Sequence, residues 1–109
     1  MKIIKEKSEL QNSIQNSEAI AVYFYNDACA PCVTLRPKIE ELITENFQKM
    51  NLVFVNSAQF PELSSEYSVF SSPTIIVFFE GKENFRVSKY VSVGEFRDKI
   101  ERYYNLLFS

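Results

Sequence analysis

The chain has 109 residues, 46% of them apolar and 15% aromatic, which suits one domain (1–109) around one core and is too short for two. Twelve basic and fourteen acidic residues give a net charge of −2 without a Lys or Arg cluster, so no nucleic-acid partner is expected. The longest apolar run, residues 19–25, is far shorter than the roughly 20 residues that cross a bilayer, so no membrane span is expected.

The N-terminal segment predicts a short strand and a helix rather than a secretion signal. Ile3 and Ile4 favour the strand, and the run from Ser8 to Gln11 resembles a capping box that starts a helix ending near Asn16. The apolar stretch and the small-residue cleavage site of a signal peptide are missing, so we expect a cytoplasmic protein.

The next two elements are a buried strand and a long helix. Residues 19–25 are continuously apolar and rich in β-branched and aromatic side chains, as expected of a strand covered on both faces. After Cys29 and Cys32, an amphipathic helix is predicted by apolar residues at helical spacing, namely Leu35, Ile39, Leu42, Ile43 and Phe47. Pro37 falls inside this helix, which should continue because the apolar period resumes beyond it.

Acidic side chains lie off the apolar stripe of this helix. An acid–base role is one interpretation of Glu40, Glu41 and Glu45. Their positions on the helix favour the other interpretation, a face exposed to solvent.

The second half of the chain continues the alternation of strands and helices. Residues 51–56 predict a buried strand, and Pro61 opens a short helix. Residues 73–79 predict a third apolar strand, which the turn at 80–83 joins to an antiparallel partner at 85–87 and 90–91. Ser92 and Glu95 form a capping box before a last helix with apolar residues at Val93, Phe96, Ile100, Tyr103, Tyr104 and Leu107.

The only two cysteines, Cys29 and Cys32, stand three residues apart between the first apolar strand and the long helix. If they open the helix, their sulfurs share one face and can meet in a disulfide. Cys29 would lie where the N–H groups of the first turn are unpaired and the helix dipole favours a thiolate, which makes it the natural nucleophile. Pro31 fits the first turn because its missing N–H has no helical partner there.

Two other interpretations of the cysteine pair remain. A zinc centre needs three or four ligands, and a chain without histidine or a third cysteine could only share a metal between molecules. The pair could also be an inert structural disulfide. No resident metal or organic cofactor is expected, and redox chemistry is the interpretation we favour.

The order of strands and helices, with a CxxC after the second strand and a proline opening the fourth, resembles the thioredoxin family. The resemblance spans nearly the whole chain, and the residues that carry it are Cys29, Ala30, Pro31, Cys32, Pro37, Tyr67, Val69, Ser72, Pro73, Thr74, Gly81 and Ser92. It implies an α/β thioredoxin fold, in which a mixed central sheet is flanked by helices on both faces. It also implies that Pro73 is cis, packs against the CxxC, and follows a residue, Ser72, whose backbone meets an extended substrate.

Several positions depart from the pattern of the family. Ala28 and Ala30 replace the tryptophan and glycine around the first cysteine, and Lys89 replaces a glycine of the substrate groove. Tyr23 stands where the family has a buried aspartate, and Phe54 stands where it has the neighbouring lysine.

The function expected from the sequence is thiol-disulfide oxidoreduction of protein substrates by a monomer, with Cys29 attacking and Cys32 resolving the mixed disulfide. The expected substrate-binding residues are Ala28, Ala30, Pro31, Ser72, Pro73 and Lys89. The resemblance implies an electron donor such as a thioredoxin reductase. The alternative is a redox-inactive binding module that uses the groove around Ser72 and Pro73.

Overall fold

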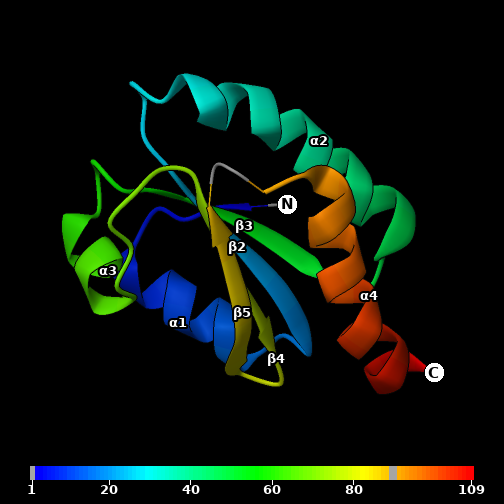
Figure 1. Cartoon of the computed structure of the whole chain (residues 1–109). Coiled ribbons are helices and arrows are strands. Elements are labelled where there is room, and N and C mark those ends of the chain that lie inside the picture. Colours follow the sequence, from blue (N-terminus) through cyan, green and yellow to red (C-terminus); the bar gives the residue numbers. More distant parts are fainter. Residues whose placement is uncertain (1, 89–90) are drawn as a thin grey trace.

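The computed structural model describes residues 2–88 and 91–109. A five-stranded sheet has the order β1-β3-β2-β4-β5, formed by β1 (Lys2–Ile3), β2 (Ala19–Tyr25), β3 (Asn51–Asn56), β4 (Thr74–Phe79) and β5 (Lys82–Ser88) (Figure 1). The helices are α1 (Lys7–Gln15), α2 (Ala30–Asn46), α3 (Pro61–Glu66) and α4 (Val93–Phe108). The sheet is mixed, because β2 runs parallel to β3 and antiparallel to β4.

The strand β2 is the centre of the molecule. It has a neighbour on each edge, and every side chain from Ala19 to Phe24 is fully buried. A strand that is apolar on both faces is stable only between two layers, which explains its uninterrupted apolar sequence. The position of β2 fixes the point where the chain leaves the sheet before the cysteines.

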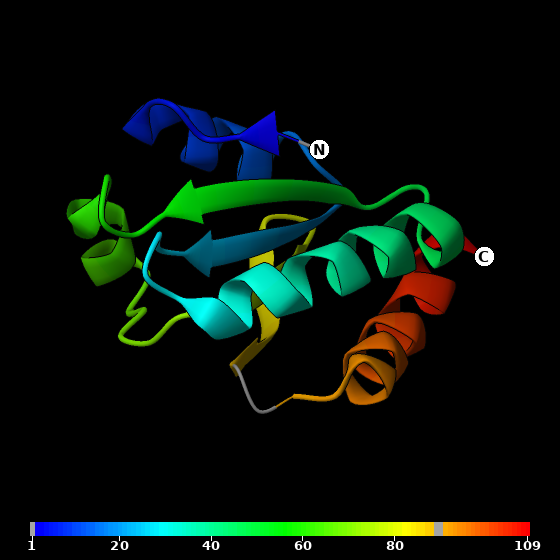
Figure 2. The same cartoon turned by 90° about the horizontal axis from the view of Figure 1, so that it is seen from above.

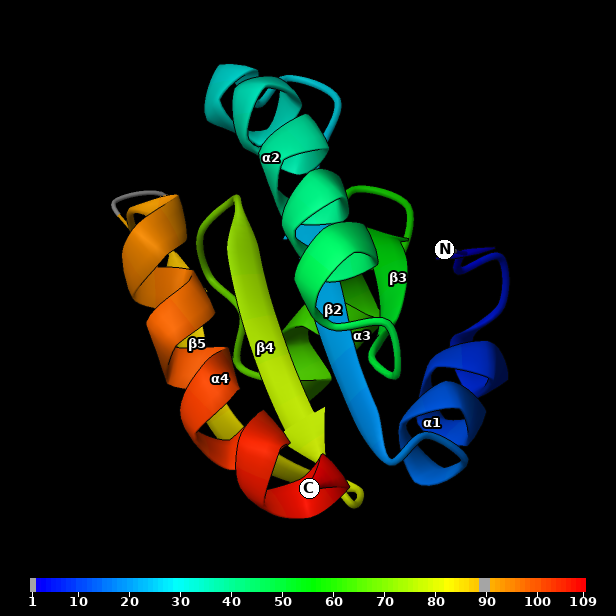
Figure 3. The same cartoon turned by 90° about the vertical axis from the view of Figure 1, so that its right-hand side faces the viewer.

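Helices cover both faces of the sheet. α2 and α4 lie in front of the sheet in Figure 3, with α1 and α3 on the far side, and Figure 2 likewise separates α1 from α2. Side chains of β2 alternate between two buried clusters: Tyr23 packs with α2 and α4, and Phe24 packs with α1 and α3. The α/β fold expected from the sequence is therefore confirmed.

Most element boundaries agree with the sequence, but the start of α1 was predicted wrongly. Ser8 lies inside the first turn, and Glu6 is the N-cap. The Glu9 carboxylate accepts hydrogen bonds from the backbone N–H groups of Lys5 at 2.8 Å and Glu6 at 2.9 Å, so the helix begins at Lys7.

The hairpin between β4 and β5 is tighter than predicted. Phe79 pairs with Lys82, so only Glu80 and Gly81 form the turn, and both have positive φ. Two such residues match the right-handed twist of the strands and allow a two-residue connection. Tyr90, expected in the second strand, lies outside the described residues.

Two further predictions concern α2 and membrane insertion. α2 continues through Pro37, as the resumed apolar period indicated. Among the residues that the structure describes, no helix combines the length and apolar character needed to cross a membrane.

The two serines near helix starts allow a direct test of the capping assignment. The Ser92 hydroxyl accepts the N–H of Glu95 at 3.1 Å, whereas Ser8 is exposed and is not the cap. Ser92→Ala should lower the free energy of unfolding by about 1 kcal/mol, and Ser8→Ala should change it little. Urea denaturation of both variants measures this difference, and equal losses would contradict the assignment.

Candidate active site

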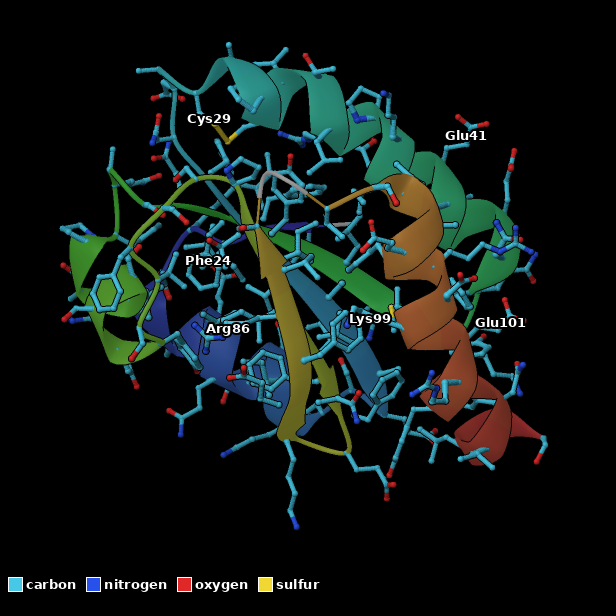
Figure 4. All side chains as sticks on the ribbon, viewed as in Figure 1. Phe24, Cys29, Glu41, Arg86, Lys99 and Glu101 are labelled. Carbon is cyan, nitrogen blue, oxygen red and sulfur yellow. A yellow bond between two sulfur atoms is a disulfide. The ribbon has the colours of Figure 1, made fainter. Side chains whose placement is uncertain are left out.

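The cysteine pair lies where β2 ends and α2 begins. Cys29 and Cys32 form a disulfide with their Cα atoms 5.3 Å apart, seen as the sulfur bond beside Cys29 in Figure 4. Both residues are largely buried, with Cys29 8% and Cys32 4% exposed. The slightly greater exposure of Cys29 agrees with its place before the helix.

The start of α2 supplies a hydrogen-bond donor to the first sulfur. Cys29 is the N-cap, and its Sγ accepts the N–H of Cys32 at 3.1 Å. Pro31 occupies the first turn, where a missing N–H costs no helical hydrogen bond. Unpaired N–H groups and the positive end of the helix dipole favour negative charge on Cys29.

The segment before β4 reaches the same edge of the sheet. Thr74 pairs with Phe24 near the end of β2, so the preceding residue, Pro73, lies at the level of the chain that leads to Cys29. The Ser72–Pro73 peptide bond is cis, and Pro73 is buried. The Thr74 hydroxyl donates to the carbonyl oxygen of Ser71 at 2.7 Å, which holds this turn together.

Two aromatic residues pack beneath the start of α2. Tyr23 pairs with Phe54 in the sheet register, and both side chains are buried, with ring centroids 5.7 Å apart. The Tyr23 hydroxyl donates to the carbonyl oxygen of Cys32 at 2.8 Å. This hydrogen bond joins the central strand directly to the turn that carries the cysteines.

A charged side chain that the sequence analysis missed, Arg36, lies over the ring of Phe54. The Arg36 guanidinium carbon is 3.9 Å from the centroid of Phe54 and 5.9 Å from that of Tyr25. Its Nε lies 2.8 Å from the Glu40 carboxylate, one helical turn further on. The useful sequence signal was the spacing, because Arg36 follows Cys32 by four residues and shares its helix face.

Glu40 therefore differs from the two other acidic residues of α2. Glu41 and Glu45 are exposed, as the solvated face predicted, but Glu40 is partly buried and paired with Arg36. The pair places both a cation and an anion on the side of α2 that faces the sheet.

The ionisation of Tyr23 follows from its burial. Removal from water raises the pKa of Tyr23 to about 12, with Arg36 lowering that pKa and Glu40 raising it. The phenol is therefore neutral at physiological pH. It can donate its hydrogen bond to Cys32 but is not a base there.

Comparison with known proteins agrees with this geometry. The thioredoxin family model matches residues 1–103. The chain belongs to the thioredoxin family.

Relatives within the family cover most of the chain. A thioredoxin of Mycoplasmoides gallisepticum is 38% identical over 82 residues, which are 75% of this chain and 81% of the relative. The solution structure of oxidised thioredoxin from Plasmodium falciparum has a TM-score of 0.82 and 25% identity, covering 94% of this chain and 97% of that one. A mutant thioredoxin of Halobacterium salinarum has a TM-score of 0.83 and 25% identity, covering 93% and 88%.

Membership in the thioredoxin family, together with a disulfide-bonded CxxC, makes this protein a thiol-disulfide oxidoreductase. Its substrates are disulfides, and its partners include reductases of the general kind that serve the family. Within the described part of the chain, no three His, Cys, Asp or Glu side chains gather as a metal site would require.

The other predicted site residues surround the cysteines to different degrees. Ala28, Ala30 and Pro31 are exposed, and Ser72 is partly buried. Lys89, expected in the substrate groove, lies outside the described residues. The structure thus gathers the cysteine turn and the segment before Pro73 at one edge of the sheet.

The buried hydroxyl of Tyr23 gives a pH-dependent test. In the unfolded chain this phenol ionises near pH 10, but in the folded protein only near 12, so its contribution to stability falls as the pH rises from 10 towards 12. Tyr23→Phe should be about 1 kcal/mol less stable at pH 8, through loss of one hydrogen bond. The difference should shrink at pH 11, as measured by urea denaturation. A difference that stays constant with pH would contradict the raised pKa.

Proposed function

We propose that Cys29 is the attacking thiol of this oxidoreductase and Cys32 the resolving thiol. In the reduced protein, the Cys29 thiolate attacks one sulfur of a substrate disulfide, forms a mixed disulfide and expels the other substrate sulfur as a thiolate. Cys32 loses its proton and attacks the Cys29 sulfur, which expels the second substrate thiolate. The substrate gains two electrons, and the protein becomes the Cys29–Cys32 disulfide.

The hydrogen bond from the Cys32 N–H to the Cys29 sulfur is the observation that best supports this order. A donor aimed at the sulfur stabilises the thiolate more than the thiol, and so does the N-terminus of α2. The pKa of reduced Cys29 should therefore lie below the roughly 8.5 of a free thiol. Cys32 lies one turn deeper and is suited to the second step.

The second step is expected to be slow. A buried thiol resists ionisation and benefits from a nearby base. Tyr23 is neutral and Phe54 has no ionisable group, so neither supplies one. Arg36 is a cation that favours a thiolate electrostatically but cannot accept its proton.

The substrate segment is expected to lie across the exposed edge beside the cysteines. Ala28, Ala30 and Pro31 would contact it from one side, and Ser72 with Pro73 from the other. The small side chains of Ala28 and Ala30 would leave room for a disulfide to approach Cys29, which is 8% exposed. Lys89 remains a predicted member of this groove.

The electron donor, the compartment, the oligomeric state and the domain organisation are also part of this proposal. A thioredoxin reductase is the electron donor that the family suggests. We also propose that the protein is cytoplasmic and monomeric. Its 109 residues would form one domain, and the family match over residues 1–103 supports this single-domain organisation.

Separate replacement of each cysteine tests the assigned roles. Cys32→Ser should retain attack and accumulate a mixed disulfide with substrate, whereas Cys29→Ser should form none and lose insulin-disulfide reduction with dithiothreitol as the electron source. Mass spectrometry after mixing each variant with oxidised insulin detects the adduct. Trapping by Cys29→Ser but not by Cys32→Ser would reverse the order of attack. A wild-type protein without insulin reduction would support a redox-inactive binding module instead.

A further inference from the structure

Arg36 holds a positive charge against the buried core. Its side chain is 35% exposed, and its Nε lies 2.8 Å from a carboxylate oxygen of Glu40. Its guanidinium carbon lies 3.9 Å from the ring centroid of Phe54, a residue that is only 1% exposed. The ion pair and the stacking on the ring together keep the guanidinium in one place, and a guanidinium stays charged throughout the working pH range.

This charge lies one helical turn after the resolving thiol. Cys32 and Arg36 are four residues apart on α2, so they share a helix face and their Cβ atoms are about 5–6 Å apart. Cys32, Tyr23 and Phe54 belong to the same buried cluster, and Arg36 packs on the Phe54 ring of that cluster. The cation is therefore a neighbour of a sulfur that is otherwise surrounded by apolar groups.

The charge of Arg36 acts on the Tyr23 hydroxyl. That hydroxyl donates to the carbonyl oxygen of Cys32 at 2.8 Å. Burial is the main cause of the raised pKa of Tyr23, and of the two charges that also act on it, Arg36 lowers this pKa more than Glu40 raises it. A net positive field therefore reaches a group in direct contact with Cys32, although Arg36 is paired with an anion.

The spacing along α2 explains why the cation outweighs its partner. Four residues, or about 6 Å of helix axis, separate Cys32 from Arg36, whereas eight residues, or about 12 Å, separate Cys32 from Glu40. The energy between two charges falls with their distance, so Arg36 acts more strongly on Cys32 than Glu40 does.

The other ionisable groups around this thiol supply no such positive charge. Further along α2, three exposed residues line a surface hollow together with Val93 of α4, namely Lys38, Glu41 and Glu45. Before Cys29, the exposed carboxylate of Asp27 opposes a thiolate, and Tyr23 of β2 is neutral. Within the described residues, Arg36 is therefore the cation placed to favour a thiolate here.

We propose that Arg36 is a positioning residue for the resolving step, in which its fixed positive charge favours the thiolate form of Cys32. The proposal rests on the roles assigned above to the two cysteines. In this step Cys32 loses its proton to solvent and its sulfur bonds to the Cys29 sulfur, while the bond from Cys29 to the substrate sulfur breaks and the substrate leaves as a thiolate. Arg36 makes the attacking form of Cys32 more abundant and does not itself accept the proton.

The pH profile of the resolving step tests this role. Arg36→Met keeps an unbranched side chain over Phe54 but removes the charge, so the pKa of Cys32 should rise by about one and its thiolate fraction at pH 7 should fall about tenfold. A more basic thiolate is more nucleophilic, with a Brønsted coefficient of about 0.4–0.5, so resolution at pH 7 should slow only about threefold. Where Cys32 is fully ionised, the variant should instead resolve about threefold faster than wild type. Stopped-flow decay of a pre-formed mixed disulfide on Cys29, recorded across pH, measures both rates.

Three variants separate charge from structure. Arg36→Lys keeps the charge and should resolve within about twofold of wild type at pH 7. Glu40→Gln keeps an acceptor for the Arg36 Nε but removes the anion, so it should resolve at least as fast as wild type. Arg97→Met is the matched control, because it removes the cation of another i,i+4 pair, 3.6 Å from Glu101 on α4 and away from Cys29 (Figure 4), and should leave the profile unchanged.

The crossing of the two profiles distinguishes an electrostatic role from a structural one. An Arg36→Met variant that is slower than wild type by the same factor at every pH would overturn the proposal, because misplacement of Cys32 would act in this way. Slowing of Arg36→Lys or Glu40→Gln to the rate of Arg36→Met would overturn it too, and so would a wild-type profile in Arg36→Met.

Titration of a single thiol separates this proposal from the assigned roles of the cysteines. In a Cys29→Ser background, iodoacetamide alkylation across pH measures the pKa of Cys32 without any disulfide exchange. Adding Arg36→Met should raise that pKa by about one, even if trapping experiments reversed the order of attack. An unchanged pKa of Cys32 would overturn the role of Arg36 and leave the order of attack untouched.

Discussion

The hydrogen bond from the Tyr23 hydroxyl to the carbonyl oxygen of Cys32 connects the most buried strand of the protein to the turn that performs the chemistry. β2 is held between two layers of helices, so Tyr23 has little freedom to move. Its hydroxyl therefore fixes the first turn of α2, and with it the N–H group that points at the Cys29 sulfur. The electrostatic effect of the helix N-terminus on Cys29, the proposed nucleophile, depends on this attachment to the core.

The residues at this hydrogen bond differ from the pattern of the family. A neutral tyrosine and a phenylalanine occupy the positions of the family's buried aspartate and lysine, and a charged pair lies instead on α2, where Arg36 covers Phe54 and binds Glu40. Replacing buried charge by packed aromatic rings favours stability, because the desolvation of unpaired or imperfectly paired ions is costly. The proposed resolving thiol, Cys32, therefore gains no base from Tyr23 or Phe54.

Features coded by local sequence were largely predictable, whereas features created by tertiary contacts were not. β2 and β3 could be identified because their residues are apolar on both faces. The helix after the cysteines could be predicted from the helical spacing of the apolar residues that follow them. Ser8 was taken for a cap because the sequence does not reveal that the Glu9 carboxylate reaches back to Lys5 and Glu6. The sequence did not predict the cleft lined by Asn26, Ser57, Ser64 and Ser72, because these residues come together only when the fold forms.

We propose that the neutral Tyr23 supplies no base for the resolving step. Stopped-flow measurement of the decay of a pre-formed mixed disulfide on Cys29 can test this proposal in wild type, Tyr23→Asp and Tyr23→Phe. We expect Tyr23→Asp to speed resolution by Cys32 on the order of tenfold to a hundredfold, as general bases do, and to lower the melting temperature. Tyr23→Phe should resolve as slowly as wild type. An unchanged rate in Tyr23→Asp would instead show that another base removes the proton from Cys32.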